Sequence, residues 1–196
     1  MSLEAAIMGF LAEQPRSGYE LKTRCFDRDA GPFWTADQAQ IYRTLERLQA
    51  AGEVACTRKR QAGRPDRKIY RLTPAGSRAL SAWLSAAEQL GPTRDPLLLR
   101  MLFSATLDDL QIAENLARWR EAHQSRLVEL RGEVSSLAAK PGAPTRERLL
   151  RAAALDGAIA KERSAIDWLD DTIEAIESGG LPAQITDVAV DRTESA

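Results

Sequence analysis

The chain has 196 residues, of which 44% are hydrophobic and 28% are charged, and its formal net charge is −1. This composition is typical of a soluble globular protein with one or two cores, and the lack of any run of about 18 apolar residues argues against a membrane span. The two cysteines, Cys25 and Cys56, lack the spacing of metal or redox sites, which predicts free thiols in a cytoplasmic protein.

Charge is distributed unevenly along this nearly neutral chain. Residues 1–90 hold 14 basic and 10 acidic side chains, a balance of +4, whereas residues 91–196 hold 13 and 18, a balance of −5. Between them, "GPTRDP" (91–96) has two prolines and a glycine, which interrupt regular structure. We therefore predict two domains, residues 1–90 and 91–180, followed by a flexible tail at 181–196.

The first domain is predicted to begin with two helices. Apolar residues from Leu3 to Leu11 recur at helical spacing, and Pro15 follows them. Ser17 is expected to cap the second helix, which "GPFW" (31–34) ends.

A third helix is predicted between Thr35, its expected cap, and Gly52, its expected stop. At 100° per residue, three apolar residues fall within about 60° of one another and form a core stripe. The core stripe consists of Ile41, Leu45 and Leu48. The opposite side carries Gln40, Arg43 and Arg47, flanked by Tyr42, with Gln38 nearer the core edge. Arginine can chelate guanine and glutamine can pair with adenine, so this face suits a DNA major groove; the alternative is the solvated face of any surface helix.

Two strands are predicted next, at 53–60 and 67–73, joined by "QAGRPD" (61–66), because β-branched and aromatic residues alternate on either side of a turn. Residues 58–73 contain seven basic side chains and one acid. Such a hairpin can reach a minor groove or a row of phosphates, although its charge can also serve only to keep it soluble. Three helices and a hairpin form the winged helix-turn-helix plan, in which the third helix reads bases and the wing grips the backbone.

Helices dominate the rest of the chain. Thr73 and Pro74 predict the cap and first residue of a fourth helix. Residues 96–105 predict a short apolar helix, and Thr106 is expected to cap a long one. A second long helix follows "KPGAP" (140–144) and ends at Gly179.

Each long helix carries a near-heptad seam. The first seam is Leu116, Trp119, His123, Leu127, Leu130, Val134 and Leu137. The second seam is Leu155, Ile159, Glu162, Ile166, Leu169, Ile173 and Ile176. An antiparallel hairpin of these helices has an apolar stripe too long to bury alone, so a second copy of the chain is expected to cover it.

Polar groups interrupt both seams at His123 and Glu162. The pair is a candidate sensor of pH or of a ligand, or else a hydrogen-bonded pair at a seam edge. Trp83, Trp119 and Trp168 are candidates for an aromatic ligand pocket, or else fill the core or an interface.

Four segments together resemble the PadR family of bacterial transcriptional regulators. They are "GYELK" (18–22), "GPFW" (31–34), "QIYRTLERLQAAGEV" (40–54) and "GRPDRKIYRLTPAG" (63–76). The likeness covers residues 3–90 closely, and the long helical second half resembles the subfamily with an extended helical dimerisation domain. The resemblance implies a mainly α fold with a small β-hairpin, in which a winged helix-turn-helix domain precedes a coiled-coil-like dimerisation domain.

The resemblance also implies a homodimeric repressor of a promoter that binds double-stranded operator DNA and is released by a small aromatic or drug-like molecule. Together with the helical face and the basic hairpin, it predicts ten DNA-binding residues. They are Gln38, Gln40, Tyr42, Arg43, Arg47, Arg58, Arg60, Arg64, Arg67 and Lys68. The candidate ligand-binding residues are Trp83, Trp119, His123, Glu162 and Trp168. No cofactor, metal or catalytic residue is expected.

Two other classes of function compete with this one. A winged domain with a helical arm can be a protein-interaction module that does not bind DNA. An enzyme is disfavoured, because the chain has a single histidine and no nucleophile elbow, phosphate loop or metal cluster.

Overall fold

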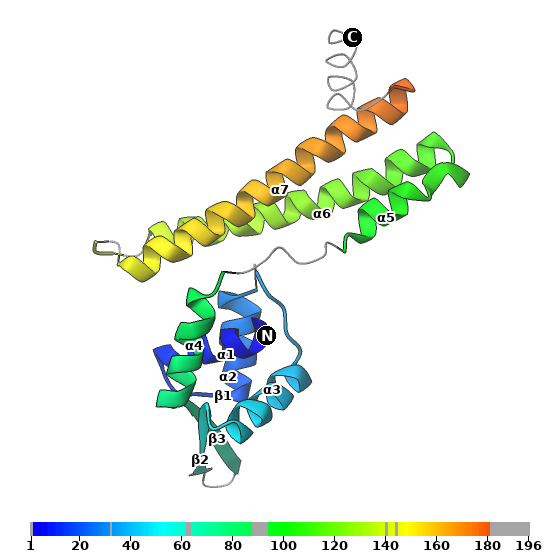
Figure 1. The fold of residues 1–196 in the computed structure, drawn as a ribbon. Coiled ribbons are helices and arrows are strands. Elements are labelled where there is room, and N and C mark those ends of the chain that lie inside the picture. Colours follow the sequence, from blue (N-terminus) through cyan, green and yellow to red (C-terminus); the bar gives the residue numbers. More distant parts are fainter. Residues whose placement is uncertain are drawn as a thin grey trace. The chain divides into compact units, whose positions relative to one another are not determined.

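The computed structural model describes residues 2–31, 33–61, 64–87, 94–139, 141–143 and 145–180, without the side chains of residues 2, 59–61 and 64–66. The chain forms two compact units, residues 1–91 and 92–196, which are described separately (Figure 1). The first combines helices with a small antiparallel sheet and the second is helical, which confirms the predicted fold class. Along the described parts of the chain, no helix has the length and apolar composition needed to cross a membrane.

The first unit follows the predicted order of three helical segments, a hairpin and a fourth helix. Its elements are α1 (Ser2–Glu13), β1 (Arg16–Ser17), α2 (Gly18–Glu20), a π-helical continuation (Leu21–Asp29), α3 (Gln38–Ala50), β2 (Val54–Gln61), β3 (Arg64–Leu72) and α4 (Pro74–Ser85). The sheet has the order β1-β3-β2, and both pairings are antiparallel. The two-residue strand β1 was not predicted, because two residues are too few to show alternation.

The caps of this unit are confirmed in two places and wrong in one. Ser17 caps α2 in a capping box with Glu20, and Thr73 caps α4 with Pro74 in its first turn. Thr35 does not cap α3. Asp37 does, because its Oδ1 accepts a hydrogen bond from the Gln40 amide at 2.7 Å.

The core of the first unit lies between α1, the second helical segment, α3 and the base of the hairpin. The predicted stripe is confirmed, since Ile41, Leu45 and Leu48 are all buried. They share a cluster with Phe26, whose ring meets that of Phe10 edge-on at 5.5 Å. The packed stripe orients α3 so that its opposite face remains exposed.

The hairpin differs from its prediction in length. β2 extends to Gln61 and β3 begins at Arg64, so the strands run into the predicted loop of residues 61–66. The predicted turn residue Gly63 lies outside the described residues. Most of the basic segment is therefore paired between β2 and β3 and does not form an open loop.

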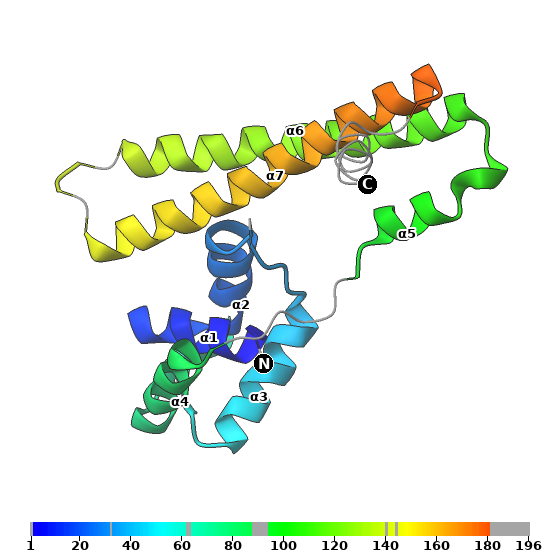
Figure 2. The ribbon, with the colours of Figure 1, turned by 45° about the horizontal axis from the view of Figure 1, so that its top comes forward.

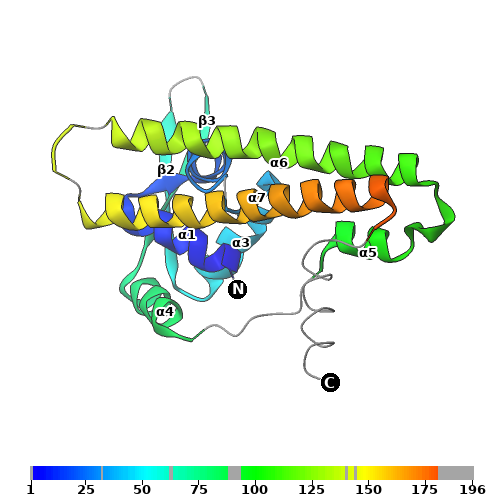
Figure 3. The ribbon, with the colours of Figure 1, turned by 90° about the horizontal axis from the view of Figure 1, so that it is seen from above.

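The second unit is an antiparallel pair of long helices with a short helix beside it. Its elements are α5 (Pro96–Leu102), a 3-10 turn (Ser104–Thr106), α6 (Asp109–Ala138) and α7 (Arg146–Ser178). Figures 2 and 3 show α6 and α7 side by side along their length. The prediction that Thr106 caps α6 is wrong. Asp108 is the cap, and it forms a capping box with Gln111. The predicted tail, 181–196, lies outside the described residues.

The two seams bury apolar residues at both ends of the helix pair. Near the α6–α7 turn, Leu127, Leu130, Leu137, Leu155 and Ile159 form one cluster. At the other end, Leu97 of α5 joins Leu116 and Leu169 in a second cluster. Gly179 ends α7 with a positive φ of 69°, as predicted.

Candidate nucleic-acid interface

The exposed face of α3 carries polar side chains above a fully packed stripe. Gln38, Gln40, Arg43 and Arg47 are all exposed. The side-chain oxygen of Gln40 accepts a hydrogen bond from the backbone amide of Asp37 at 3.2 Å. The side-chain nitrogen of Gln40 is therefore the group that remains to contact a partner. The N-terminal half of α3 thus combines a secure cap with donors that can point away from the protein.

The two arginines of this face have different surroundings. Arg47 lies 3.2 Å from a Glu4 carboxylate oxygen of α1, and its guanidinium also approaches Thr44 at 3.5 Å. Arg43 has no hydrogen-bond or ion-pair partner within the described part of the chain. Both line an open hollow of about 800 Å³ beside α3. Arg43 is therefore the α3 cation best able to chelate a base edge.

Tyr42 is held against α2 and is only partly exposed. A Cβ atom built on Gly18 would lie 2.6 Å from Cε1 of Tyr42, so the ring lies directly on the Gly18 backbone. Any larger residue at position 18 would have to displace the Tyr42 ring. The contact fixes the start of α3 against the first turn of α2.

The hairpin of β2 and β3, called the wing from here on, places like charges opposite one another across its two strands. Arg58 pairs in register with Lys68, and Lys59 pairs with Arg67. Like charges directly opposite on a sheet are destabilising, so the Arg58–Lys68 pair favours an anionic partner. Arg58 and Lys68 are exposed. Of the other predicted wing residues, the side chains of Arg60 and Arg64 lie outside those described.

Arg67 has partners inside the protein that the sequence did not reveal. Its Nη2 lies 2.6 Å from Oε2 of Glu20 and donates to Oγ of Ser17 at 3.1 Å. Glu20 is 47 positions away, and only the pairing of β1 with β3 brings the two together. The one available signal was the Ser17–Glu20 capping pattern, which placed the carboxylate at the first turn of α2.

The environment of Glu20 lowers its pKa. Burial alone would raise the pKa. Hydrogen bonds from the Ser17 amide, from Arg67 and from the Ser17 hydroxyl, together with the positive charge of Arg67, outweigh burial and lower the pKa from 4.5 to about 2. The folded state therefore favours the carboxylate, so the stability it contributes is present above the unfolded pKa of about 4.5 and is lost as the pH falls toward 2.

We predict that Glu20→Gln destabilises the first unit at neutral pH. The expected loss is about 1–2 kcal/mol after allowance for solvent screening of the half-exposed Arg67 partner. Denaturant unfolding of both proteins from pH 7 to pH 2 should show the difference shrinking between about pH 4.5 and pH 2. A difference that stays constant over that range would contradict the assignment.

In the second unit, the two seam polar residues meet. His123 Nδ1 lies 2.5 Å from Oε2 of Glu162, and Arg126 Nε lies 3.0 Å from the other carboxylate oxygen. The Trp119 ring is 6.4 Å from that of His123. Arg126 was not predicted, because it lies outside the seam. The group links α6 to α7 between the two apolar clusters.

The remaining predicted ligand residues separate into different places. Trp168 and His123 line a hollow of about 660 Å³, together with Lys161 and Asp95. Trp83 belongs to α4 of the first unit. The structure thus brings Trp119, His123, Glu162 and Trp168 into one unit, and their role in ligand binding stays a prediction.

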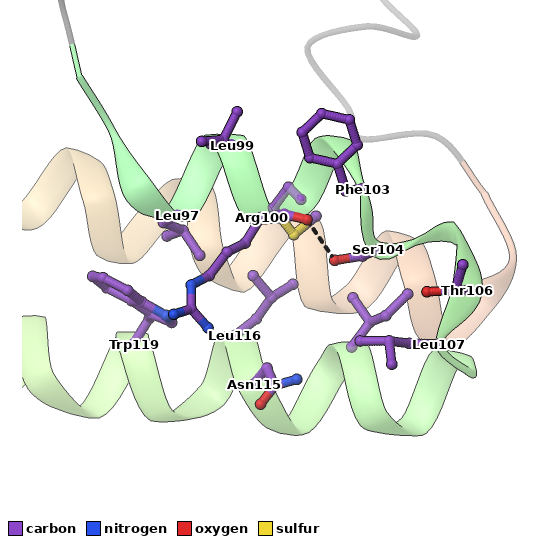
Figure 4. Close-up of a pocket in the computed structure, with 12 residues that line it drawn as sticks. Leu97, Leu99, Arg100, Phe103, Ser104, Thr106, Leu107, Asn115, Leu116 and Trp119 are labelled. Atoms are coloured by element: carbon purple, nitrogen blue, oxygen red, sulfur yellow. Dashed lines mark hydrogen bonds between the residues drawn. The ribbon is translucent and has the colours of Figure 1, made fainter.

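A more enclosed cavity, of about 410 Å³, lies between α5 and the first turns of α6. Its wall is mainly apolar and includes Leu97, Leu107 and Leu116, with Trp119 at one end. Arg100 is the one ionisable side chain of its lining, and Figure 4 shows it extending between Trp119 and Leu116. Such a cavity suits a small apolar molecule with a hydrogen-bond acceptor or a negative charge.

Two family models match this chain, one in each unit. The "Transcriptional regulator PadR-like family" matches residues 7–82, and "Virulence activator alpha C-term" matches residues 93–177. A probable transcriptional regulator of Mycobacterium tuberculosis is 38% identical over 190 residues, which cover 90% of this chain and 98% of that protein. The negative transcriptional regulator PadR of Bacillus subtilis is 26% identical over 178 residues, covering 89% and 97%.

Solved structures agree over both units. Bacillus subtilis PadR in complex with operator DNA has a TM-score of 0.76 at 25% identity, covering 90% of this chain and 99% of PadR. The complex of the same protein with p-coumaric acid has a TM-score of 0.72 at 25% identity, covering 89% and 95%.

Proposed function

Because this chain belongs to the PadR-like family of transcriptional regulators, we propose that it is a homodimeric repressor that binds operator DNA and is released by a small molecule. The observation that carries the DNA-binding proposal is the arrangement of the first unit. One domain presents both Arg43 on α3, which has no partner among the described residues, and a hairpin in which Arg58 lies opposite Lys68. These relatives are regulators and not enzymes. We propose that this chain acts in the cytoplasm, where a regulator can reach DNA.

On DNA, α3 would enter the major groove and the wing would follow the phosphate backbone. Arg43 would chelate a base, and the free amide nitrogen of Gln40 would donate to a neighbouring edge. Arg58 and Lys68 would face phosphates, which relieve their mutual repulsion. The repressor role is supported by the name of the Bacillus subtilis relative, a negative transcriptional regulator.

Dimerisation is supported by large apolar side chains that the single chain leaves exposed. Leu102, Phe103 and Leu110 are exposed to 73%, 69% and 70%, and they lie on α5 and around the start of α6. Leaving such a patch in water is unfavourable, and a second copy would cover it. A helix of 33 residues spans about 50 Å at 1.5 Å per residue, which is long enough to hold two α3 helices one DNA turn apart.

Release by a small molecule is supported by the cavity beside Arg100 and by the p-coumaric acid complex of Bacillus subtilis PadR. A ligand can lower operator affinity only by the difference between its affinities for the free and the DNA-bound conformations. A ligand in this cavity contacts α5, which carries part of the exposed apolar patch. It could therefore change how two copies meet.

The test of DNA binding uses the full chain and the DNA upstream of its own gene. We expect a gel shift on a palindromic fragment, and an affinity that falls steeply with salt because phosphate contacts release counterions. A scrambled fragment of equal length is the control. Equal affinity for both fragments at every salt concentration would contradict operator recognition, and no binding at low salt would instead favour a protein-interaction module.

The ligand proposal is tested in the same titration. p-Coumaric acid is the probe, and it is expected to weaken binding of wild type but not of Arg100→Gln, which loses the only charge of the cavity lining. Loss of tryptophan fluorescence on titration of wild type, but not of Trp119→Phe, would report occupancy. Equal release of both proteins would place the ligand elsewhere.

A further inference from the structure

We infer that Arg67 is a positioning residue, which ties the wing to the first turn of α2, rather than a ligand of DNA phosphate. The inference rests on the proposed DNA-binding function. It reassigns one residue of the basic hairpin on the basis of its contacts with Glu20 and Ser17.

The contact lies where backbone pairing ends. β1 meets β3 at two positions, Arg16 with Tyr70 and Ser17 with Ile69. Arg67 is two residues closer to the tip of the wing, and its guanidinium reaches back to Ser17 and Glu20. The Arg67 side chain therefore adds one more contact between the wing and the rest of the domain, beyond the last backbone pair of β1 and β3.

The acceptor of the Arg67 hydrogen bond, the Glu20 carboxylate, is also held in place by Ser17. Oε2 of Glu20 accepts from the Ser17 amide at 2.9 Å and from the Ser17 hydroxyl at 3.0 Å, and Arg67 adds a third donor at 2.6 Å. The Glu20 side chain is 23% exposed and that of Arg67 is 38% exposed, so the pair is partly shielded from solvent. A phosphate would have to displace a fixed carboxylate in order to recruit this arginine.

The same turn of α2 also holds α3. Tyr42 of α3 lies on Gly18, between the two residues that hold Arg67. The turn at 17–20 is thus a shared support for α3 and for the wing. Through it, Arg67 sets the angle and distance between the two DNA-contacting elements, and a wing that swings freely would meet phosphates less often.

The experiment removes the charge of Glu20 and keeps the capping box that residue 20 forms with Ser17. Glu20→Gln retains the capping box, because glutamine serves at that position as glutamate does. Asp27→Asn is the matched control: it adds the same charge in the same unit, and Asp27 pairs with Lys22 rather than with the wing. Hydrogen exchange of the β2 and β3 amides in the free protein, operator affinity and its salt dependence are measured for each.

For Glu20→Gln we expect faster exchange in the outer half of the wing and operator binding weakened about 3- to 5-fold, with an unchanged salt slope. Asp27→Asn should leave wing exchange unchanged and should not weaken binding. Adding Arg67→Gln to Glu20→Gln should cause no further loss, since both act through one contact.

Tighter binding by Glu20→Gln, with a salt slope steeper by about one phosphate contact, would overturn the inference, because it would show that Glu20 withholds Arg67 from DNA. Unchanged wing exchange would overturn it as well. If wild type binds no DNA, the proposed function fails, while the exchange measurement still decides whether Glu20 and Arg67 hold the wing.

Discussion

Replacing Leu102 by Glu and Phe103 by Ser is expected to separate the proposed dimer into single chains and to weaken operator binding by about 100-fold or more. Both side chains are largely exposed in one chain, so their loss costs the fold little. Each contributes about 1.5–3 kcal/mol when a second copy buries it. Two linked half-sites gain about 10²- to 10⁴-fold in avidity, which single chains lose.

Sedimentation equilibrium gives the mass of the assembly, and fluorescence anisotropy gives the operator affinity. Leu84→Glu is the control, because Leu84 is 67% exposed but belongs to α4 of the first unit. If the Leu102 and Phe103 variant keeps the mass of two chains, the apolar patch around α5 is not the dimer contact.

Replacing Arg43 by Ala is expected to lower operator affinity by about 10- to 100-fold and to affect random DNA much less. A bidentate arginine–guanine contact contributes about 1–3 kcal/mol of discrimination, and no other described residue engages Arg43. Arg47→Ala should have a smaller effect, because Glu4 already occupies that guanidinium.

The measurement for Arg43 is a pair of binding isotherms, on operator and on random DNA, at one salt concentration. The ratio of the two affinities is the informative quantity, since it cancels the sequence-independent phosphate term. Equal losses on both DNAs would show that Arg43 contacts phosphate and that another residue reads the bases.

Periodicity and caps were enough to predict most of the fold. The stripe of α3 and the seams of α6 and α7 are long patterns, in which burial of one face outweighs local detail. The two wrong caps share one cause. At Thr35 and at Thr106 an aspartate follows two residues later, and in each case that aspartate forms the capping box with a glutamine. In both segments the aspartate, followed three residues later by a glutamine, is the stronger capping signal.

The site was only partly predictable, because its decisive contacts join distant residues. The pairing of Arg67 with Glu20 depends on the register of β1 against β3, and β1 is too short to be seen in a sequence. The contact of Tyr42 with Gly18 depends on how α3 crosses α2. By contrast, the His123–Glu162 pair followed from matching positions on two seams, because antiparallel heptads bring facing residues together.

The central claim is that two copies of the chain present α3 and the wing to successive turns of one duplex. Hydroxyl-radical footprinting of the wild-type protein on its own upstream DNA tests this directly. The account predicts two protected half-sites on one face of the helix, about 10 base pairs apart from centre to centre. Protection of a single half-site, or uniform protection that salt removes evenly, would contradict it.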